Sequence, residues 1–342
     1  MDRVQILHWL KKDDGSRLEE LWRLADTVRR EYVGDQVHLR GLIEISNHCS
    51  RLCGYCGLRT DHRDLERYRM TREEILDCAH QAVQFGYGTV VMQSGEDWGI
   101  ERDWMADLIR TIKTTTPLAV TLSLGERTEE DFLAWRQAGA DRYLLRFETS
   151  NRALYEKIHP SPSGKISDRF AILRRLRQLG YEIGSGVMIG IPGQTYDDLA
   201  DDLEQFRQMD LDMIGVGPYL PHPATPLGRQ PLPASTDQVP NSELMTYKTL
   251  ALTRIACPQA NIPSTTALAT LNLESGRELG LRRGANVVMP NLTPAKYREK
   301  YEIYPAKACI RESAQQCHGC LKKRIESIHR TPGAGPGSRK KT

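Results

Sequence analysis

Eight short apolar stretches alternate along this chain with segments whose apolar residues recur at helical spacing. Such alternation is typical of parallel sheets, because two neighbouring parallel strands need a helical crossover between them. Eight repeats within 342 residues predict an α/β fold, a (β/α)8 barrel of the TIM type, with an open parallel sheet as the alternative. The predicted strands cover residues 41–46, 89–94, 119–125, 142–149, 183–190, 213–220, 261–268 and 285–291.

Three segments flank the predicted barrel, which spans residues 35–305. Residues 1–34 have apolar residues at helical spacing and predict an N-terminal helical segment. Residues 306–328 form a C-terminal extension with three of the eight cysteines. Residues 329–342 are rich in glycine, with a basic end, and have the composition of a disordered tail. Inside the barrel, residues 221–240 are rich in proline and predict a long loop.

The composition argues against several classes of function. The formal net charge is +3 and aromatic residues are sparse, so neither nucleic acid nor an anionic membrane is expected as a partner. No segment has the length of a membrane span or the pattern of a signal peptide, which predicts a cytoplasmic protein. Six cysteines fall into two groups of three, and in the cytoplasm such grouping favours metal ligation over disulfides. Cys78 and Cys257 stand apart and are expected to be small buried residues.

The first group of cysteines has the spacing Cys49-x3-Cys53-x2-Cys56 and follows the first predicted strand directly. Three thiolates within eight residues can hold one 4Fe–4S cluster, and the fourth iron then stays open to a small molecule. Active sites of barrels lie at the carboxyl ends of the strands, where this group falls. A zinc site is the alternative, but His48 adjoins Cys49 and makes an awkward fourth ligand.

Polar side chains also gather at the ends of other predicted strands. Arg146 and Glu148 share one face of their strand because side chains alternate, and two charges there are costly unless they are paired or used. Thr121 shares a face with Ser123 in the third predicted strand. The seventh predicted strand also ends in polar residues. These side chains predict a barrel whose upper interior is polar.

The cysteine spacing, its place after the first strand and Tyr55 before the last cysteine resemble the radical S-adenosylmethionine (SAM) superfamily. In that superfamily SAM chelates the open iron, and one electron from the cluster cleaves SAM to methionine and a 5′-deoxyadenosyl radical. The turn Ser94-Gly95-Glu96 resembles the superfamily's turn that receives the SAM amino group. The strand end at Gly190 and Ile191 resembles its adenine-binding motif, although Gly193 stands where a glutamate is often found.

Longer stretches narrow the resemblance to the HydE family of FeFe-hydrogenase maturases, with biotin synthase and methylornithine synthase as relatives. They cover most of residues 35–325 and include RYRMT (67–71), QSGED (93–97), GADRYLLR (139–146), IPSTTA (262–267) and GANVVMPN (284–291). The resemblance implies assembly of the diiron precursor of the hydrogenase active site (the H-cluster). The implied substrate is an iron–cysteine complex carrying carbon monoxide and cyanide, made by a partner maturase.

The resemblance also implies an electron donor such as ferredoxin or flavodoxin, and other hydrogenase maturation proteins, as partners. Two alternatives stay open. One is a radical SAM mutase or synthase that acts on an amino acid, as methylornithine synthase does. The other is a non-catalytic iron–sulfur scaffold that passes iron to a partner.

Individual roles follow from the same resemblance. Arg169 is expected to pair with the SAM carboxylate, and Glu148 to lie near its ribose or methionine. The expected SAM-binding residues are Tyr55, Ser94, Thr121, Arg146, Glu148, Arg169, Gly190 and Ile191. The expected substrate-cavity residues are Thr265, Thr266, Ala267, Met289, Tyr301 and Tyr304.

The second group of cysteines has the spacing Cys309-x7-Cys317-x2-Cys320 and follows the last predicted strand. It resembles the auxiliary iron–sulfur site that some members of the family lack. A zinc site with His318 is the alternative. Because the group lies beyond the barrel in sequence, we expect it to be peripheral and dispensable for SAM cleavage.

Overall fold

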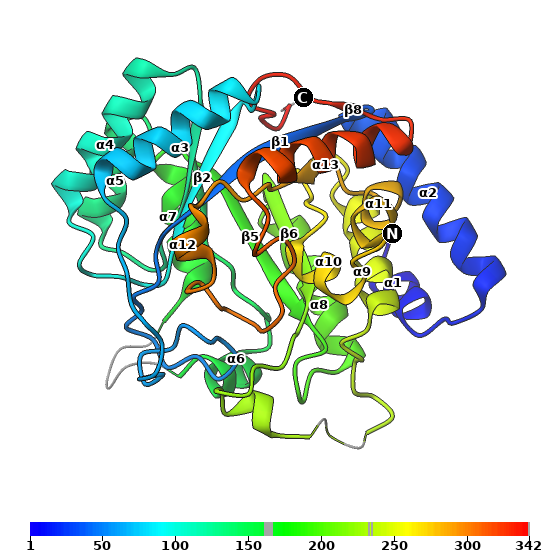
Figure 1. Cartoon of the computed structure of the whole chain (residues 1–342). Coiled ribbons are helices and arrows are strands. Elements are labelled where there is room, and N and C mark those ends of the chain that lie inside the picture. Colours follow the sequence, from blue (N-terminus) through cyan, green and yellow to red (C-terminus); the bar gives the residue numbers. More distant parts are fainter. Residues whose placement is uncertain (161–166, 232, 234, 341–342) are drawn as a thin grey trace.

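A parallel sheet curved into a barrel forms the centre of the molecule (Figure 1). The computed structural model describes residues 1–160, 167–231, 233 and 235–340. Its strands run in the order β6-β5-β4-β3-β2-β1-β7, and every pair is parallel. The strands are β1 Gln36–Ser46, β2 Thr89–Ser94, β3 Ala119–Ser123, β4 Arg142–Leu144, β5 Glu182–Ile189, β6 Met213–Pro218 and β7 Val287–Val288. The predicted α/β barrel is confirmed.

The barrel closes between β6 and β7 through a segment that is not a regular strand. Residues 261–263 lie there and make only isolated bridges, Met213 with Asn261 and Pro263 with Val287. The strand predicted over residues 261–268 is therefore wrong in type. Pro263 has no N–H to donate to a ladder, and Thr265 already caps the next helix through its side chain.

Helices cover the outside of the sheet, and apolar residues such as Ile43, Val90 and Val120 are fully buried beneath them. Side chains at the first turns define several helix starts, as at Thr71, where a capping box begins α3. The helices are α3 Arg72–Gln84, α4 Arg102–Thr115, α5 Glu129–Gln137, α6 Arg152–Ile158, α7 Arg169–Gln178, α8 Tyr196–Gln208, η1 Leu227–Arg229, α9 Glu243–Ala256, α10 Thr266–Leu271, α11 Gly276–Arg282, α12 Ala295–Arg298 and α13 Ala314–Ser327.

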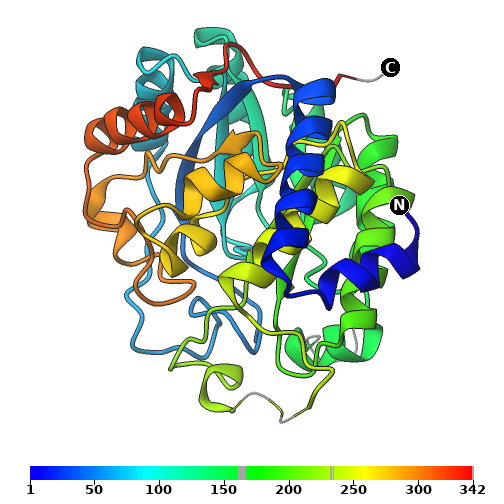
Figure 2. The ribbon, with the colours of Figure 1, turned by 90° about the vertical axis from the view of Figure 1, so that its right-hand side faces the viewer.

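The N-terminal segment is helical, as the sequence predicts, but it forms two helices. These are α1 (Arg3–Leu10) and α2 (Gly15–Val33), which pack against α8 and α9 at the side of the barrel (Figure 2). In the part of the chain that the structure describes, no helix combines the length and the apolar character that crossing a bilayer requires.

Glycines on the inner face of one strand, β6, make room inside the barrel. A Cβ atom on Gly215 of β6 would lie 3.2 Å from Nη1 of Arg146, and one on Gly217 would lie 3.2 Å from Oγ1 of Thr265. These are closer than side chains normally approach a neighbour. The glycines therefore leave space at this wall for the Arg146 side chain and for an internal cavity.

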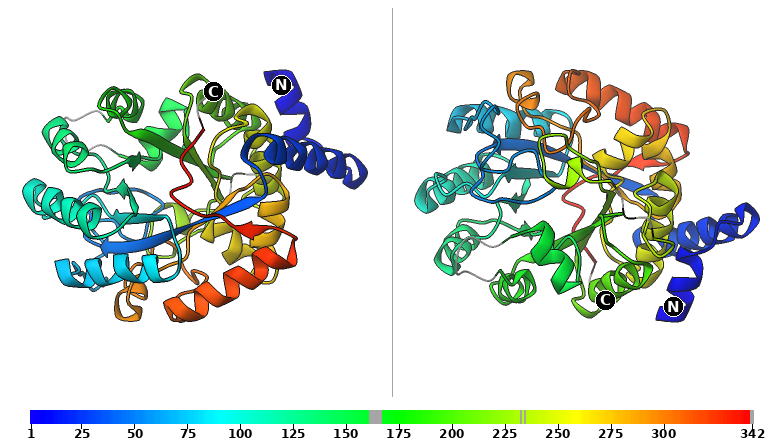
Figure 3. Two further views of the ribbon diagram at one scale, coloured as in Figure 1. Left: turned by 90° about the horizontal axis from the view of Figure 1, so that it is seen from above. Right: turned by 90° about the horizontal axis from the view of Figure 1, so that it is seen from below.

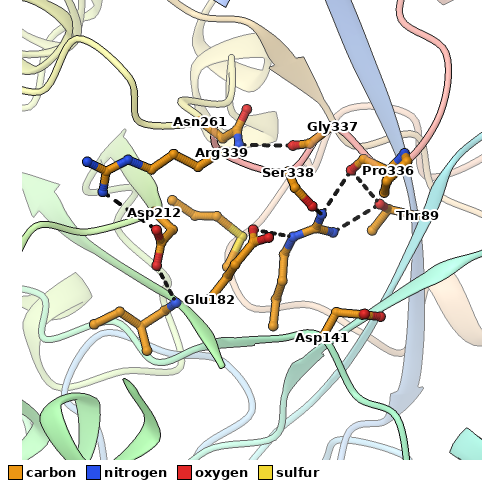
Figure 4. A network of polar contacts seen from close by, with 12 residues as sticks. Thr89, Asp141, Glu182, Asp212, Asn261, Pro336, Gly337, Ser338 and Arg339 are labelled. Atoms are coloured by element: carbon orange, nitrogen blue, oxygen red, sulfur yellow. Dashed lines mark hydrogen bonds and ion pairs between the residues drawn. The ribbon is translucent and has the colours of Figure 1, made fainter. Parts of the chain in front are cut away.

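The C-terminal tail crosses the base of the barrel, at the amino ends of the strands (Figure 3, left). Strand β8 (Thr331–Pro332) pairs with the start of β1. Beyond it, Arg142 donates from Nη2 to the carbonyl oxygen of Pro336 at 3.0 Å and to Oγ of Ser338 at 2.7 Å. The Asn261 side chain donates to the Gly337 carbonyl at 3.0 Å (Figure 4). Main-chain oxygens of the tail thus satisfy buried polar groups.

This ordered docking differs from the disordered tail that the glycine-rich composition predicts. The glycines allow the close fit. A Cβ atom on Gly88, just before β2, would lie 1.8 Å from the Gly335 carbonyl oxygen, and one on Gly337 would lie 2.5 Å from the His38 ring. Gly337 also has a φ of +58°, which side chains rarely adopt. Glycine-rich composition is typical of disordered tails, but glycines are also needed where a chain packs closely against a narrow barrel base. Composition alone does not distinguish the two.

We predict that Gly88→Ala lowers the free energy of unfolding by about 2 kcal/mol, because the added methyl group displaces the tail from the base. Chemical denaturation measures the change. Gly319→Ala is the matched control: a methyl group there, on helix α13, would meet nothing within 4 Å apart from the adjoining residues and backbone of its own helix, so it should be neutral or slightly stabilising. In a chain ending at Arg330 the Gly88→Ala change should cost far less. An equal cost in both chains would contradict the displacement of the tail.

Candidate active site

A cavity of about 330 Å³ lies inside the barrel toward the carboxyl ends of the strands. It collects side chains from β1, β2, β4, β5, β6 and the segments after them. Most residues that the sequence singles out contribute to its lining: Cys49, Tyr55, Cys56, Ser94, Arg146, Glu148, Thr265, Thr266, Ala267, Met289, Tyr301 and Tyr304. The structure therefore brings the first cysteine group and the strand-end residues to one space.

Among the residues predicted to hold the first cluster and SAM, five lie outside this lining. Cys53 is buried behind it, and Thr121 is buried with no hydrogen-bond partner for Oγ1 in the described part of the chain. Gly190 has a φ of +79° and turns the chain after β5. Ile191 packs in a small apolar cluster that Tyr55 adjoins. Arg169 is buried as well, in a network of charges described below.

The three cysteines of the first group are free thiols, two of them at the cavity wall. Burial raises the pKa of all three, to about 12 for Cys56. Backbone N–H groups act in the opposite direction: the amide of Glu96 lies 3.4 Å from Sγ of Cys49, and that of Leu58 lowers the pKa of Cys56. Amides that point at sulfur stabilise thiolates, which suits ligands of a metal cluster.

No three His, Cys, Asp or Glu side chains of the described residues converge on a single point as ligands of one ion. A cubane cluster does not require such convergence, because each of its thiolates binds a different iron. The three thiols of this loop therefore fit a cluster of that kind.

A buried network of charges lies directly behind the cysteine loop. Arg51, between Cys49 and Cys53, pairs with Glu96 at 2.7 Å and with Glu126 at 2.8 Å. The side chains of all three charged residues are at most 10% exposed. Sequence reasoning missed Arg51 and the role of Glu126. An arginine inside a cysteine loop was the available signal, since a charge at that place needs a partner.

Arg169, at the start of α7, belongs to the same network. Its Nε donates to Glu126 at 2.9 Å, Nη2 lies 2.7 Å from Nε2 of His159, and Nη1 donates to the Arg146 carbonyl. Burial alone would raise the pKa of Glu126, but Arg169 and the Ser167 hydroxyl outweigh burial and lower it. All three guanidinium nitrogens of Arg169 thus have protein partners.

Arg146 and Glu148 form an ion pair at the cavity wall. Nε of Arg146 donates to both carboxylate oxygens of Glu148, at 3.0 and 3.1 Å, and Nη2 donates to the Val187 carbonyl at 2.6 Å. Glu148 has a φ of +62°, which is uncommon for a residue with a side chain. The pair therefore presents an oriented carboxylate on a constrained backbone.

Two residues of the second cysteine group, Cys309 and Cys317, line the same cavity, whereas Cys320 is exposed on α13. This differs from the peripheral position that their place in the sequence predicts. A hydrogen bond from the Cys317 thiol lowers the pKa of Cys309. Nη2 of Arg277 lies 3.9 Å from Sγ of Cys309. The loop before α13 folds back over the barrel and so carries these residues inward.

Sequence reasoning also missed a second ion pair in the wall. Glu44 of β1 and Lys307 line the cavity, and Nζ of Lys307 lies 2.6 Å from Oε1 of Glu44. The two residues are 263 positions apart, so spacing carries no signal for the contact. A buried carboxylate in the middle of the first strand was the only hint.

Comparisons with known proteins identify the family of this chain. The model of the radical SAM superfamily matches residues 43–206. The FeFe-hydrogenase maturase subunit HydE of Thermotoga maritima is 50% identical over 94% of this chain and 89% of its own. The 3-methylornithine synthase of Methanosarcina acetivorans is 30% identical over 82% of this chain and 76% of its own.

Solved structures agree on the fold. Methylornithine synthase (PylB) is similar with a TM-score of 0.81 at 24% identity, covering 97% of this chain and 94% of that one. The maturase HydG of Carboxydothermus hydrogenoformans has a TM-score of 0.73 at 18% identity, covering 96% and 74%. The chain is thus a radical SAM enzyme, as the barrel and the cysteine loop define that class. Within this class it belongs to the HydE family of FeFe-hydrogenase maturases.

We predict that Arg51→Met lowers the free energy of unfolding by about 3–5 kcal/mol, because Glu96 and Glu126 lose their shared buried cation. Chemical denaturation of protein without its cluster measures this change apart from iron binding. Arg110→Met is the control, since Arg110 pairs with Asp107 at the surface and should change stability by under about 1 kcal/mol. Similar effects of the two substitutions would contradict the structural weight given to Arg51.

Proposed function

We propose that this radical SAM enzyme cleaves SAM beside its first cysteine group and acts on a small organometallic substrate during assembly of the FeFe-hydrogenase active site. The observation that carries the proposal is one cavity shared by Cys49, Cys56 and the Arg146–Glu148 pair, in a chain 50% identical to a HydE maturase.

The cofactors that the family implies are a 4Fe–4S cluster and SAM. Cys49, Cys53 and Cys56 would hold the cluster, and the amides that point at Cys49 and Cys56 support this assignment. When bound, the cluster supplies the electron that splits SAM into methionine and a 5′-deoxyadenosyl radical. The apolar side chains of Leu58, Met188 and other lining residues keep water away from that space.

The residues around the cysteine loop would orient SAM. Glu148, held by Arg146, offers a fixed carboxylate to which hydroxyl or ammonium groups can donate. Tyr55 and Ser94 reach the same wall, and Thr121, Gly190 and Ile191 would support it from behind. Arg169 would hold the SAM carboxylate by exchanging one of its present partners, most simply the neutral ring of His159.

The substrate that the HydE family implies is an iron–cysteine complex with carbon monoxide and cyanide, from a partner radical SAM maturase. Thr265, Thr266, Ala267, Met289, Tyr301 and Tyr304 would line its place. A ferredoxin or flavodoxin would supply electrons, and the enzyme would act with other maturation proteins in the cytoplasm. A methylornithine-synthase-like activity is the second candidate, because that fold is similar at a TM-score of 0.81, but the sequence is more similar to HydE.

Cys309, Cys317 and Cys320 would hold an auxiliary iron–sulfur cluster. Two observations support this assignment. Cys309 contacts Cys317, and the nearby Arg277 guanidinium favours the thiolate form of Cys309. Cys320 lies one helical turn after Cys317 on α13, so the two can face the same ligand.

We predict that Cys53→Ala abolishes formation of 5′-deoxyadenosine, because one of three cluster ligands is lost. Anaerobic reconstitution with iron, sulfide, SAM and a reductant, followed by chromatography of the adenosyl products, tests this. Cys257→Ala removes a thiol far from the cavity lining and should retain activity. Cleavage of SAM by the Cys53 variant would overturn the cluster assignment. If the unmodified enzyme cleaves no SAM, with or without the substrate, the non-catalytic iron–sulfur scaffold is favoured.

We predict that replacing Cys317 and Cys320 together with serine lowers the iron content but leaves reductive SAM cleavage largely intact. The Arg146–Glu148 pair and the first cysteine loop keep their contacts in that variant. Iron per chain and the rate of 5′-deoxyadenosine formation are measured side by side. An unchanged iron content would rule out the auxiliary cluster, and loss of cleavage in a folded variant would rule out its dispensability.

A further inference from the structure

The Lys307–Glu44 ion pair stands in the cavity wall on the side of β1, with β2 and β3 between it and β4, which leads to the Arg146–Glu148 pair. Both side chains of the pair are nearly fully buried, at 5% and 2% exposed. The loop that carries Lys307 also carries Tyr304 and Cys309. A charge from this loop therefore reaches into the barrel beside the space proposed for the substrate.

Glu44 is held rigidly for this contact. Oε1 accepts from Lys307 at 2.6 Å, and Oε2 accepts from the Asn291 side chain at 2.9 Å. The Glu44 amide donates to Oγ1 of Thr293 at 2.8 Å. A carboxylate fixed at both oxygens in turn fixes the ammonium group that it binds.

The ammonium group of Lys307 has three N–H donors, and two of them have partners. One partner is Glu44, and the other is the Tyr301 carbonyl oxygen at 3.2 Å. Among the described residues Nζ has no other acceptor, and the side chain lines the cavity. One donor is thus left for a molecule inside the cavity.

Charge on the cavity wall indicates what that molecule carries. Of the charged side chains in the lining, Arg146 pairs with Glu148 and Lys307 pairs with Glu44, while Arg277 faces the sulfur of Cys309. Buried ion pairs add little stability over apolar residues, so a pair placed in a reaction cavity is a candidate for function. The acceptor that best fits the remaining N–H of the Lys307 ammonium group is an anionic oxygen, because a hydrogen bond between two charged groups is stronger than one between neutral groups.

We propose that Lys307, held by Glu44, is a substrate-positioning residue that donates its third N–H to a carboxylate of the substrate. The proposal rests on the function proposed above, in which the substrate derives from an amino acid. It assigns one end of that substrate to the β1 wall. The reacting end then faces the cysteine loop and the Arg146–Glu148 pair.

The test compares Lys307→Met and Lys307→Arg in the reconstituted holoenzyme with the iron–cysteine complex as substrate. We expect Lys307→Met to raise KM for the complex roughly ten- to a hundredfold, more than kcat falls, because a charge-assisted hydrogen bond is lost. Lys307→Arg should recover part of the affinity. A KM equal to that of the unmodified enzyme, in a folded Lys307→Met protein, overturns the proposal.

Two further variants separate positioning from folding. Glu44→Gln combined with Lys307→Met leaves no unpaired charge in the wall and should fold while keeping the high KM. Lys248→Met is the matched control. Lys248 is equally buried and pairs with Asp13 at 2.7 Å, and neither residue lines the cavity. Its stability should fall while KM stays unchanged. A KM rise of the same size in Lys248→Met would mean that any lost buried lysine has this effect.

Binding can also be followed without turnover. We expect L-cysteine to compete with the complex better than cysteamine, which lacks the carboxylate, in the unmodified enzyme but not in Lys307→Met. Equal competition by the two in the unmodified enzyme overturns the carboxylate assignment. Failure of the underlying function looks different: the unmodified enzyme would then show no SAM cleavage dependent on the complex.

Discussion

The charge network around Arg51 is the constraint on which the rest of the site depends. Arg51 follows β1, Glu96 follows β2, Glu126 follows β3 and Arg169 begins α7 beyond β4. Their ion pairs join the carboxyl ends of four successive strands. A loop with three thiols has no regular structure of its own to hold its shape, so buried, mutually satisfied charges behind it supply the rigidity.

The sequence predicts those parts of the molecule that depend on local pattern. Strands β1, β2, β3, β5 and β6 fall where apolar runs predict them, because each is a buried parallel strand between helices. The cysteine loop is equally local. The strand predicted over residues 261–268 is not formed, and the tail is docked, because the conformations of Pro263 and of the tail glycines depend on the residues packed around them.

Contacts between distant residues set the remaining limits. Arg51 with Glu126, and Glu44 with Lys307, pair across loops that only the folded barrel brings together. The alternating glycines Gly215 and Gly217 were a readable sign that one wall of the barrel is hollow, because a filled barrel needs side chains there. The cavity is thus asymmetric: polar side chains line it near β1 and β4, whereas glycine backbone lines it at β6.

The docked tail has a consequence for how the protein is made. Arg40 on β1 donates to the carbonyl oxygen of Gly337, which lies 297 positions later in the chain. Translation supplies the two halves of that contact many seconds apart, at roughly 5–20 residues per second. Until the later half emerges, the base of the nascent barrel stays open and its arginines stay hydrated. Completion of the barrel base is therefore coupled to synthesis of the residues around Gly337.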